Sequence, residues 1–280
     1  MSGGALVVVA TPIGNLGDLS PRAVEALAAA DVIACEDTRR TRKLLTHSGI
    51  GGKRLLSVHD RNEAARAGEV VGLVRAGRRV ALVSDAGTPG ISDPGERLVA
   101  ATTAAGLPVE VVPGPSAVVA ALVASGLPAG RFVFEGFLPR KGRERGERLA
   151  AVAGERRTTV LFEAPHRVVD TLADLAEACG TGRRAALARE LTKLHEEVWR
   201  GTLGDAVERE AARPPQGEYV IVVDGASSPA APEESDIEDA LAVRMGEGEQ
   251  KRAAVAAVAA ELGVPKRRVY DVAVRLGDRG

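Results

Sequence analysis

The residues best suited to chemistry lie in "SDAGTPGISDPG", Ser84 to Gly95, where two carboxylates stand among glycines and prolines. Glycine lacks a Cβ, so its backbone can approach a ligand closely, and proline fixes φ, which keeps an empty loop from collapsing. The side chains of Asp85 and Asp93 can accept hydrogen bonds from an ammonium group or a ribose hydroxyl. No Lys or Arg lies between Asp85 and Gly95. The segment therefore favours a ligand with a cationic part.

Two other segments are similarly rich in glycine and proline, since "ATPIGNLGD" begins at Ala10 and "VPGPSA" begins at Val112. Each of the three follows an apolar run that predicts a strand, and ligands of open α/β sheets bind beyond the carboxyl ends of the strands. Glycine and proline also punctuate ordinary turns, which is the simpler interpretation of any single loop. Three such loops at one edge favour a binding site. The chain has neither GxxxxGKS nor GxxxxGKT, and the first loop is not GxGxxG, so a phosphate-binding loop is less favoured.

The elements that must position these loops alternate between strand and helix through residues 1–125, which predicts a first α/β domain with a mostly parallel sheet. "ALVVVA" predicts the first strand, and the next helix has Ser20 as its N-cap and Pro21 at its first position. We predict a second α/β domain over residues 126–224. Several of its strands, such as "RRAALARE" and "EEVWRGTL", follow one another without a helix between them, which predicts antiparallel pairs in a mixed sheet.

The rest of the chain predicts a linker and a small helical module. Residues 225–235, "GASSPAAPEES", are rich in proline and small residues, which is typical of a flexible tether. Residues 236–280 have helical patterns, and the last two helices meet at "GVP", residues 263–265, with helix-turn-helix spacing.

Composition narrows the class of protein. A chain of 280 residues is long for one core and indicates more than one domain. Apolar residues make up 45% and aromatic residues only 2%, so Ala, Val and Leu must fill the cores. The formal net charge is −1, so the molecule as a whole does not attract nucleic acid, and RNA binding requires a local basic patch.

Neither the cysteines nor the histidines have the spacing of a metal site. Cys35 and Cys179 stand alone, so we expect two reduced, packed thiols rather than a disulfide, and the four histidines form no HxxxH pair. The apolar run Ala117–Ala124 is far shorter than the about 20 residues of a membrane span, and the N-terminus lacks the basic segment of a secretory signal. We expect a soluble, cytoplasmic protein without a metal.

Seven ordered segments resemble the ribosomal RNA small subunit methyltransferase I family of the tetrapyrrole methylase superfamily. They lie between about residues 5 and 223 and are "ATPIGNLGDLSPRAVEAL", "ACEDTRRTRKLL", "SDAGTPGISDPG", "VPGPSAVVAAL", "FEGFLPRKG", "FEAPHRV" and "ARELTKLHEEVWRGTL". The resemblance implies two α/β domains with S-adenosylmethionine in the cleft between them, 2′-O-methylation of a cytidine in 16S rRNA, and a homodimer. The first loop has "TPIGN" where the wider superfamily has GxGPG, which fits the ribosomal RNA branch and weakens a tetrapyrrole substrate.

The same resemblance assigns a set of cofactor-binding residues to the three loops and to two strands of the second domain. They are Pro12, Gly14, Asp85, Ala86, Gly87, Thr88, Ile91, Ser92, Ser116, Ala117, Phe162, Glu163 and Ala188. The sulfonium of S-adenosylmethionine is the cationic part that the acidic loop favours.

A ribose hydroxyl is a poor nucleophile, so a base within hydrogen-bond reach would accelerate the transfer. The candidate bases in "FEAPHR" and "ARELTK" are Glu163, His166, Glu190 and Lys193. Each has a structural alternative. The two glutamates could pair with Arg167 or Arg189, and the histidine could cap a helix. For Lys193 to act as the general base, burial or neighbouring cations would have to lower its pKa so that the neutral amine is populated.

Two basic clusters are candidates for gripping RNA. The first cluster is "PRKGRERGER", residues 139–148, which predicts a mobile basic loop that contacts RNA phosphates. The alternative for this segment is the solvent-exposed start of a helix. The second cluster is "TRRTRK", residues 38–43. The candidate residues are Arg39, Arg40, Arg140, Lys141, Arg143 and Arg145. Because aromatic residues are scarce, we expect recognition through the RNA backbone and shape. "KRR" at residues 266–268 is either a further RNA contact or part of a plain packing module.

Two other functions compete with rRNA methylation. A methyltransferase of tetrapyrroles or other small molecules shares the cofactor loops but has no use for the basic segment. A non-enzymatic, ribosome-associated RNA-binding protein would use the terminal helices but would not need three cofactor-like loops.

Overall fold

The computed structural model describes residues 3–227 and 232–277. The chain divides after Ala226 into two compact units, residues 1–226 and 227–280. Residues 228–231 of the predicted linker lie outside the described part. In the described part, no helix is long and apolar enough to cross a membrane.

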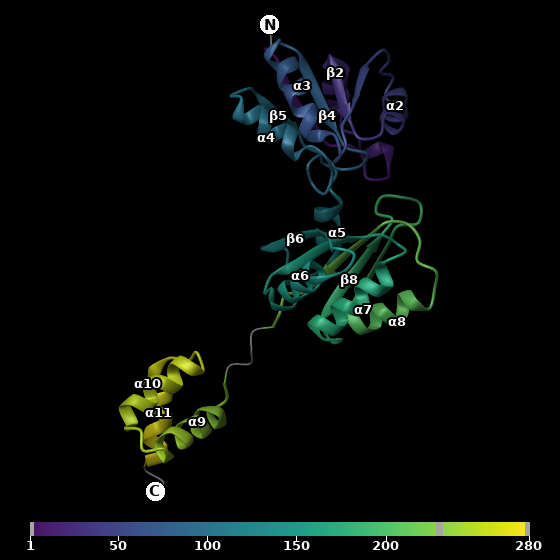
Figure 1. The fold of residues 1–280 in the computed structure, drawn as a ribbon. Helices are drawn as coiled ribbons and strands as arrows, with labels where there is room; N and C mark the ends of the chain where they lie inside the picture. Colours follow the sequence, from purple (N-terminus) through teal and green to yellow (C-terminus); the bar gives the residue numbers. More distant parts are fainter. Residues whose placement is uncertain (1–2, 228–231, 278–280) are drawn as a thin grey trace. The chain divides into compact units, whose positions relative to one another are not determined.

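The first sheet of the large unit is parallel throughout, in the order β3-β2-β4-β1-β5 (Figure 1). Its strands are β1 (Ala5–Val9), β2 (Val32–Cys35), β3 (Arg54–Ser57), β4 (Arg79–Val83) and β5 (Val109–Val112). β1 and β2 are buried along their whole length, since helices cover both faces of a parallel sheet.

Four helices make the two outer layers of this sheet: α1 (Pro21–Ala29), α2 (Thr38–His47), α3 (Glu63–Arg75) and α4 (Glu96–Ala104). α1 and α2 bury Leu27 and Leu45 on one face, while α3 and α4 bury Val70 and Leu98 on the other. Figure 1 shows α2 on the opposite side of the sheet from α3 and α4. The predicted start of α1 is confirmed, because the Ser20 side chain accepts a hydrogen bond from the Ala23 N–H.

The second sheet has the order β6-β7-β10-β8-β9 and is mixed, as predicted. Its strands are β6 (Phe132–Phe137), β7 (Thr158–Glu163), β8 (Arg184–Arg189), β9 (Glu197–Thr202) and β10 (Tyr219–Val223). β6 and β7 are parallel, whereas β10 is antiparallel to β7 and β8, and β8 is antiparallel to β9.

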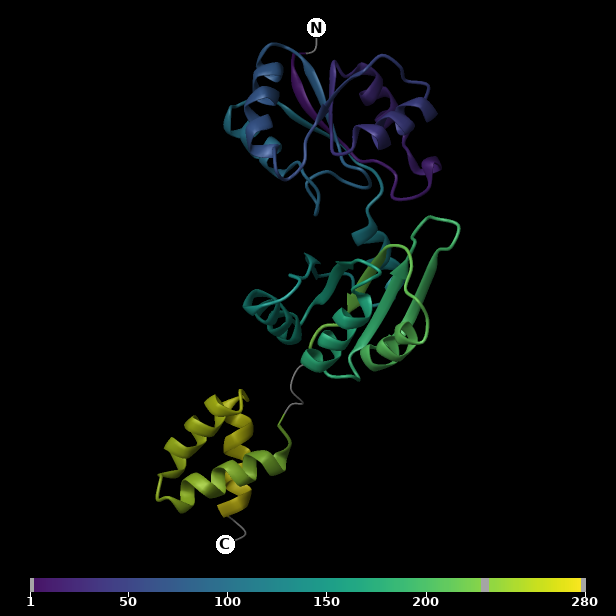
Figure 2. The ribbon, with the colours of Figure 1, turned by 45° about the vertical axis from the view of Figure 1, so that its right-hand side comes forward.

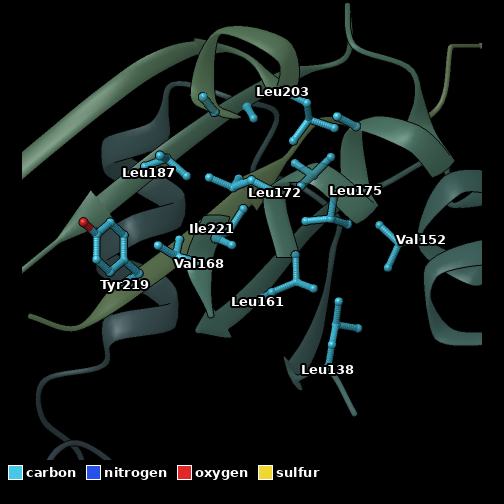
Figure 3. Packing of buried hydrophobic residues seen from close by; sticks show 14 residues of the cluster. Leu138, Val152, Leu161, Val168, Leu172, Leu175, Leu187, Leu203, Tyr219 and Ile221 are labelled. Carbon is cyan, nitrogen blue, oxygen red and sulfur yellow. The ribbon is translucent and has the colours of Figure 1, made fainter. Parts of the chain in front are cut away.

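Three helices cover one face of the second sheet: α6 (Arg143–Gly154), α7 (Val168–Cys179) and α8 (Leu203–Ala211). Leu172 and Leu175 of α7 meet Ile221 of β10 in the centre of this core (Figure 3). The residues around them are mostly Leu and Val with one Tyr, as the scarcity of aromatic residues predicts.

α5 (Ala117–Ser125) covers the other face of the second sheet. We predicted it as the last helix of the first domain, but Val118, Ala121 and Leu122 pack against strands β7, β8 and β10. The loop after β5 leads the chain from the first sheet to the second, so the apolar side of α5 packs on the second sheet. By packing, the second domain therefore begins near residue 117 rather than at 126.

The small unit consists of α9 (Glu234–Gly246), α10 (Lys251–Glu261) and α11 (Lys266–Gly277), which pack against one another (Figure 2). It has a hydrophobic core of its own that includes Ile237, Val258 and Val272. Between α10 and α11 the chain turns at Gly263, whose φ of +64° favours glycine. α9 begins at Glu234, two residues before the predicted start of the module.

Candidate active site

Strands β4, β1 and β5 are neighbours in the first sheet, so the three loops that follow them lie side by side at its carboxyl edge. The first two loops are joined directly. The Thr11 N–H donates to the Gly87 carbonyl at 2.8 Å, and the Gly87 N–H donates to the Thr11 carbonyl at 3.1 Å. The prediction that these loops share one edge of the sheet is confirmed.

The loop from Ser84 to Gly95 is fastened at both ends. At its start, Asp85 Oδ1 accepts a hydrogen bond from the Asp37 N–H at 3.0 Å. At its end, Glu63 Oε1 accepts from the N–H groups of Gly95 and Arg97, at 2.8 and 2.9 Å. Glu63 is buried at the start of α3 and so caps α4 from a neighbouring helix. Sequence reasoning missed Glu63, because nothing in the local pattern links the two helices.

Residues with strained backbone conformations lie in this loop and in the segment that follows β8. Among the described residues, the non-glycine residues with positive φ are Ser92, Glu190 and Thr192. Ser92 lies in the loop after β4 and the other two follow β8, and a Cβ at Gly136 of β6 would lie 3.0 Å from Ser92 Oγ. Such conformations persist only where the surrounding structure holds them, and they cluster at functional sites.

A cavity of about 320 Å³ lies between the loops of the first sheet and the strand ends of the second. Most of the predicted cofactor-binding residues line it: Ala86, Gly87, Thr88, Ile91, Ser92, Ser116, Ala117, Phe162, Glu163 and Ala188. Ile13, Phe137 and Leu191 line it too and were not predicted as site residues. Asp93 also lines it; the sequence indicated its carboxylate as a ligand acceptor, but the family resemblance did not include it among the cofactor-binding residues.

A second cavity of about 430 Å³ adjoins the first, and Ile13, Ala86 and Glu218 line both. The remaining predicted cofactor residues, Pro12, Gly14 and Asp85, line only this second cavity. Its rim carries cations from both domains, which are Arg40, Lys43 and Lys193. The predicted set is therefore divided between two adjoining cavities that share Ile13, Ala86 and Glu218.

Several carboxylates lie near one another at this edge. Burial raises the pKa of Asp93 to about 6; the nearby Asp85 and Asp60 carboxylates add to this rise, and a hydrogen bond with Ser84 opposes it. Burial also raises the pKa of Glu36, at the end of β2, and the same acidic neighbours add to it. A cationic ligand would relieve this repulsion.

Asp93→Asn is expected to be more thermostable than the wild type at pH 8, to keep a smaller advantage at pH 5, and to lose it as the pH approaches the ordinary value of 3.8. Because the folded-state pKa of Asp93 is raised from 3.8 to about 6, the folded protein holds a proton that the unfolded chain releases between these two values, and the stability of the wild type falls over that range as the pH rises. The neutral amide removes that loss. Thermal unfolding at both pH values measures it, and an equal difference between the proteins at pH 5 and pH 8 would contradict the burial argument.

The first candidate base, Glu163, is buried in a network of hydrogen bonds. Its side chain accepts from Thr171 Oγ1 at 2.7 Å and from the Ala164 N–H at 2.8 Å, and Arg167 Nη2 lies 3.3 Å from it. The structural alternative, an ion pair with Arg167, is therefore present. Glu163 also lines the first cavity.

Lys193 is held between two carboxylates, with its Nζ 2.8 Å from Glu190 Oε1 and 2.9 Å from Glu218 Oε2. Burial works against its charge, but these bonds prevail and the pKa of Lys193 is raised, which is opposite to what a basic lysine needs. Burial opposes the charge of Glu190 too and by itself would raise the pKa of this carboxyl. The hydrogen bonds from Lys193 and from the Glu218 N–H outweigh burial, so the pKa of Glu190 is lowered. The predicted pairing of Glu190 with Arg167 or Arg189 is replaced by a pair with Lys193.

His166 is exposed and lines neither cavity. It does not cap the following helix either, since the N-cap of α7 is Arg167. The structural alternative for His166, a helix cap, is therefore wrong, because α7 begins at Val168 and the residue next to it is Arg167.

The predicted RNA-binding residues differ in their surroundings. Arg145 is wrong as an RNA contact, because it is largely buried and binds Asp174 at 2.6 Å, Thr171 Oγ1 at 3.1 Å and the Pro139 carbonyl at 2.8 Å. Arg143 is exposed and pairs with Glu147 on the same helix. The predicted mobile loop is in large part the start of α6, which begins at Arg143.

The other basic candidates lie at the surface. Arg39 pairs with Asp37 at 2.9 Å, and Arg40 Nε lies 3.5 Å from Asp85 Oδ2. Within residues 3–227 and 232–277, neither Arg140 nor Lys141 has a carboxylate partner, and both are exposed.

Both cysteines are free, as predicted, and burial raises the pKa of each thiol. In the described part of the chain, no group of three or more His, Cys, Asp or Glu side chains is placed to hold a metal ion.

Comparison with known proteins agrees with this architecture. The profile of the tetrapyrrole (corrin/porphyrin) methylases matches residues 5–207. The ribosomal RNA small subunit methyltransferase I of Synechocystis is 47% identical over 275 residues, with 98% of each chain covered. The protein of the same name from Escherichia coli O157:H7 is 43% identical, covering 98% of this chain and 96% of its own.

Among solved structures, the fold is similar to that of a uroporphyrin-III C-methyltransferase from Thermus thermophilus, which was determined as a complex with S-adenosylhomocysteine. The two share a TM-score of 0.52 at 22% identity, covering 79% of this chain and 97% of the other. At this identity the likeness concerns the fold alone. The near full-length relatives carry the closer assignment: the chain belongs to the tetrapyrrole methylase family and, within it, to the ribosomal RNA small subunit methyltransferase I proteins.

Proposed function

We propose that the protein transfers a methyl group from S-adenosylmethionine to the ribose 2′-hydroxyl of a cytidine in 16S rRNA of the small ribosomal subunit. The observation that carries the proposal is the pair of adjoining cavities at the carboxyl edge of the first sheet. One is lined by most of the residues that the family resemblance assigns to the cofactor, and the other has a cationic rim and is lined by the remaining three, Pro12, Gly14 and Asp85. The relatives' names support the substrate.

The residues of the first cavity suit this cofactor. Asp93 and its acidic neighbours favour the positive sulfur, while Ile13, Phe137 and Phe162 provide apolar surface. Gly87 brings its backbone to the cavity wall at a φ of +78°. When bound, S-adenosylmethionine supplies a methyl group that its sulfonium has already activated. The protein's share of the catalysis is then mainly to position the two reactants and exclude water.

The contact between Gly14 and the segment after β8 serves this positioning. A Cβ at residue 14 would lie 2.5 Å from Lys193 Cγ and 3.0 Å from the Leu191 carbonyl, so only glycine allows this approach. The Asn15 N–H also donates to Thr192 Oγ1 at 3.1 Å. We propose that Lys193 and Glu190 act through this contact, by holding the two domains' loops in register, rather than as proton acceptors.

The direct test is methyl transfer by the full-length protein to 30S subunits from cells lacking the gene. We expect transfer to one cytidine ribose, located by mass mapping of the 16S rRNA. Transfer to uroporphyrinogen or a precorrin instead would support the small-molecule alternative. Calorimetry that detects no S-adenosylmethionine binding would support the non-enzymatic alternative.

We propose that Arg140 and Lys141 contact RNA phosphates, since both are exposed and unpaired in the described residues. The double variant Arg140→Glu/Lys141→Glu is expected to weaken binding to 30S subunits about tenfold or more and to reduce the salt dependence of binding by about two phosphate contacts. Cofactor affinity should not change. Filter binding over a range of salt concentrations measures the effect. If the dependence of the binding constant on salt concentration is unchanged, these residues do not contact RNA phosphates.

The small unit is proposed to make an auxiliary contact with the ribosome or its RNA through the start of α11. Lys266, Arg267 and Tyr270 are exposed there, whereas Arg268 donates to the Pro232 carbonyl. The acidic residues of α9 limit the positive charge of the unit, so we expect a modest contribution.

Truncation after Asp224 is therefore expected to leave a folded protein with full cofactor affinity and several-fold weaker activity on 30S subunits. The two units have separate cores, which is why the large unit should fold without the small one. Thermal unfolding and calorimetry of the truncated chain test this. A truncated chain that aggregates or loses its cooperative transition would show that the helices complete the large unit.

We also propose a homodimer that acts in the cytoplasm, where its substrate is assembled. Val119 and Val123 form an exposed apolar stripe on α5, one helical turn apart, which favours a partner of the same chain. Sedimentation of the wild type and of Val123→Asp measures the association.

A further inference from the structure

We propose that the second cavity receives the target nucleotide and that Arg40 and Lys43 hold the phosphates beside it. This inference rests on the proposed function and adds the part of the protein that would orient the ribose. The cavity is lined by apolar groups of Pro12, Ile13 and Leu16, by the carboxylate of Asp85, and by cations at its rim.

The chemistry of the lining matches a ribonucleotide within a chain. Phosphodiesters need cations at the rim, ribose hydroxyls need an acceptor such as the Asp85 carboxylate, and a base needs apolar surface such as Leu16, which is 44% exposed. The rim cations would attract the carboxylates of a tetrapyrrole as well as phosphates, so the choice of a ribonucleotide rests on the proposed function.

The position of the cavity is right for the transfer. Ile13, Ala86 and Glu218 line both cavities, so a ribose in the second can reach a methyl group presented from the first. Asp85 faces the second cavity and Gly87 faces the first, with Ala86 between them. The first cavity, proposed for the methyl donor, and the second cavity, proposed for the nucleotide, thus adjoin at the loop after β4, which hydrogen bonds hold at both ends.

The cations of the rim are not equivalent. Lys193 is already bound by Glu190 and Glu218. Arg40 is 65% exposed in its side chain and meets Asp85 only at 3.5 Å, so its guanidinium remains available for a phosphate. Lys43 is exposed and has no carboxylate partner in the described parts of the chain. Arg40 and Lys43 are three residues apart on α2 and so lie on one face, which Arg42 does not share.

The test compares two double variants that each remove two positive charges. Arg40→Gln/Lys43→Gln removes the rim, and the control Arg22→Gln/Arg75→Gln removes two exposed charges that line neither cavity and lie outside the basic clusters. We expect the rim variant to raise the KM for 30S subunits by about 10- to 100-fold and to reduce the salt dependence, while the calorimetric Kd for S-adenosylmethionine stays the same. The control should match the wild type in all three measurements.

Each outcome decides for or against the pocket. If the rim variant methylates 30S subunits with the wild-type KM, the inference is wrong. If the control loses affinity equally, the effect is that of net charge, and the pocket is also rejected. If the wild type does not methylate 30S subunits at all, the proposed function fails. The pocket would then be judged by filter binding of 16S rRNA, where the rim variant alone should lose affinity.

Discussion

Gly87→Val is expected to raise the Kd for S-adenosylmethionine by at least about 100-fold, equivalent to about 3 kcal/mol, while both sheets stay folded. Gly87 has a φ of +78°, and a Cβ there would touch Ile13 Cγ2 at 3.4 Å. A β-branched side chain cannot adopt this φ without strain, and its methyl groups would point at the cavity that Gly87 lines. Calorimetry with the purified variant measures the loss.

Gly106→Val is the matched control, since Gly106 has a φ of +67° and no atom within 4 Å of its Cβ position. It follows α4 and lines neither cavity. We expect the control to lose a similar amount of thermal stability but no cofactor affinity. Wild-type affinity in Gly87→Val would show that the loop is an ordinary turn.

Glu163→Ala is expected to destabilise the protein by about 3 kcal/mol, or roughly 6–12 °C in Tm. The side chain of Glu163 is fully buried and satisfies Thr171, the Ala164 N–H and Arg167 at once. Its removal leaves the largely buried Arg167 guanidinium without its carboxylate, although the bond from Arg167 to the Leu138 carbonyl remains. Differential scanning calorimetry measures the change.

Glu163→Gln separates the structural role from a catalytic one. Its amide keeps an acceptor for Thr171 but loses the charge beside Arg167, so we expect about half of the destabilisation. A Gln variant that unfolds like the wild type but has lost all methyl transfer would instead identify Glu163 as the base and overturn the structural interpretation.

The carboxyl-edge site could be predicted from sequence because its signals are local. Each loop rich in glycine and proline follows a buried strand, and parallel strands place their carboxyl ends together. Ser20 and Pro21 likewise fix the start of α1 through bonds within one turn. The residues of the cofactor cavity came from family resemblance, and the cavity brings most of them together.

The errors share another physical origin. Arg145 looks like its neighbours Arg143 and Lys141 in sequence, yet it is tied to Asp174 and Thr171 of α7, which lie 26 or more positions away. Whether a cation is free depends on which carboxylate the fold brings to it, and a basic run does not contain that information.

The sequence by itself determined the alternation of strands and helices, the acidic loop and the tethered helical module, because hydrophobic periodicity and turn residues act over a few positions. Only the tertiary structure decided that α5 belongs to the second sheet, that Glu63 caps α4, and that the site is divided into two cavities. These features depend on contacts between segments distant in the chain. Such contacts are fixed by packing and by the pairing of buried charges, which no short stretch of residues specifies.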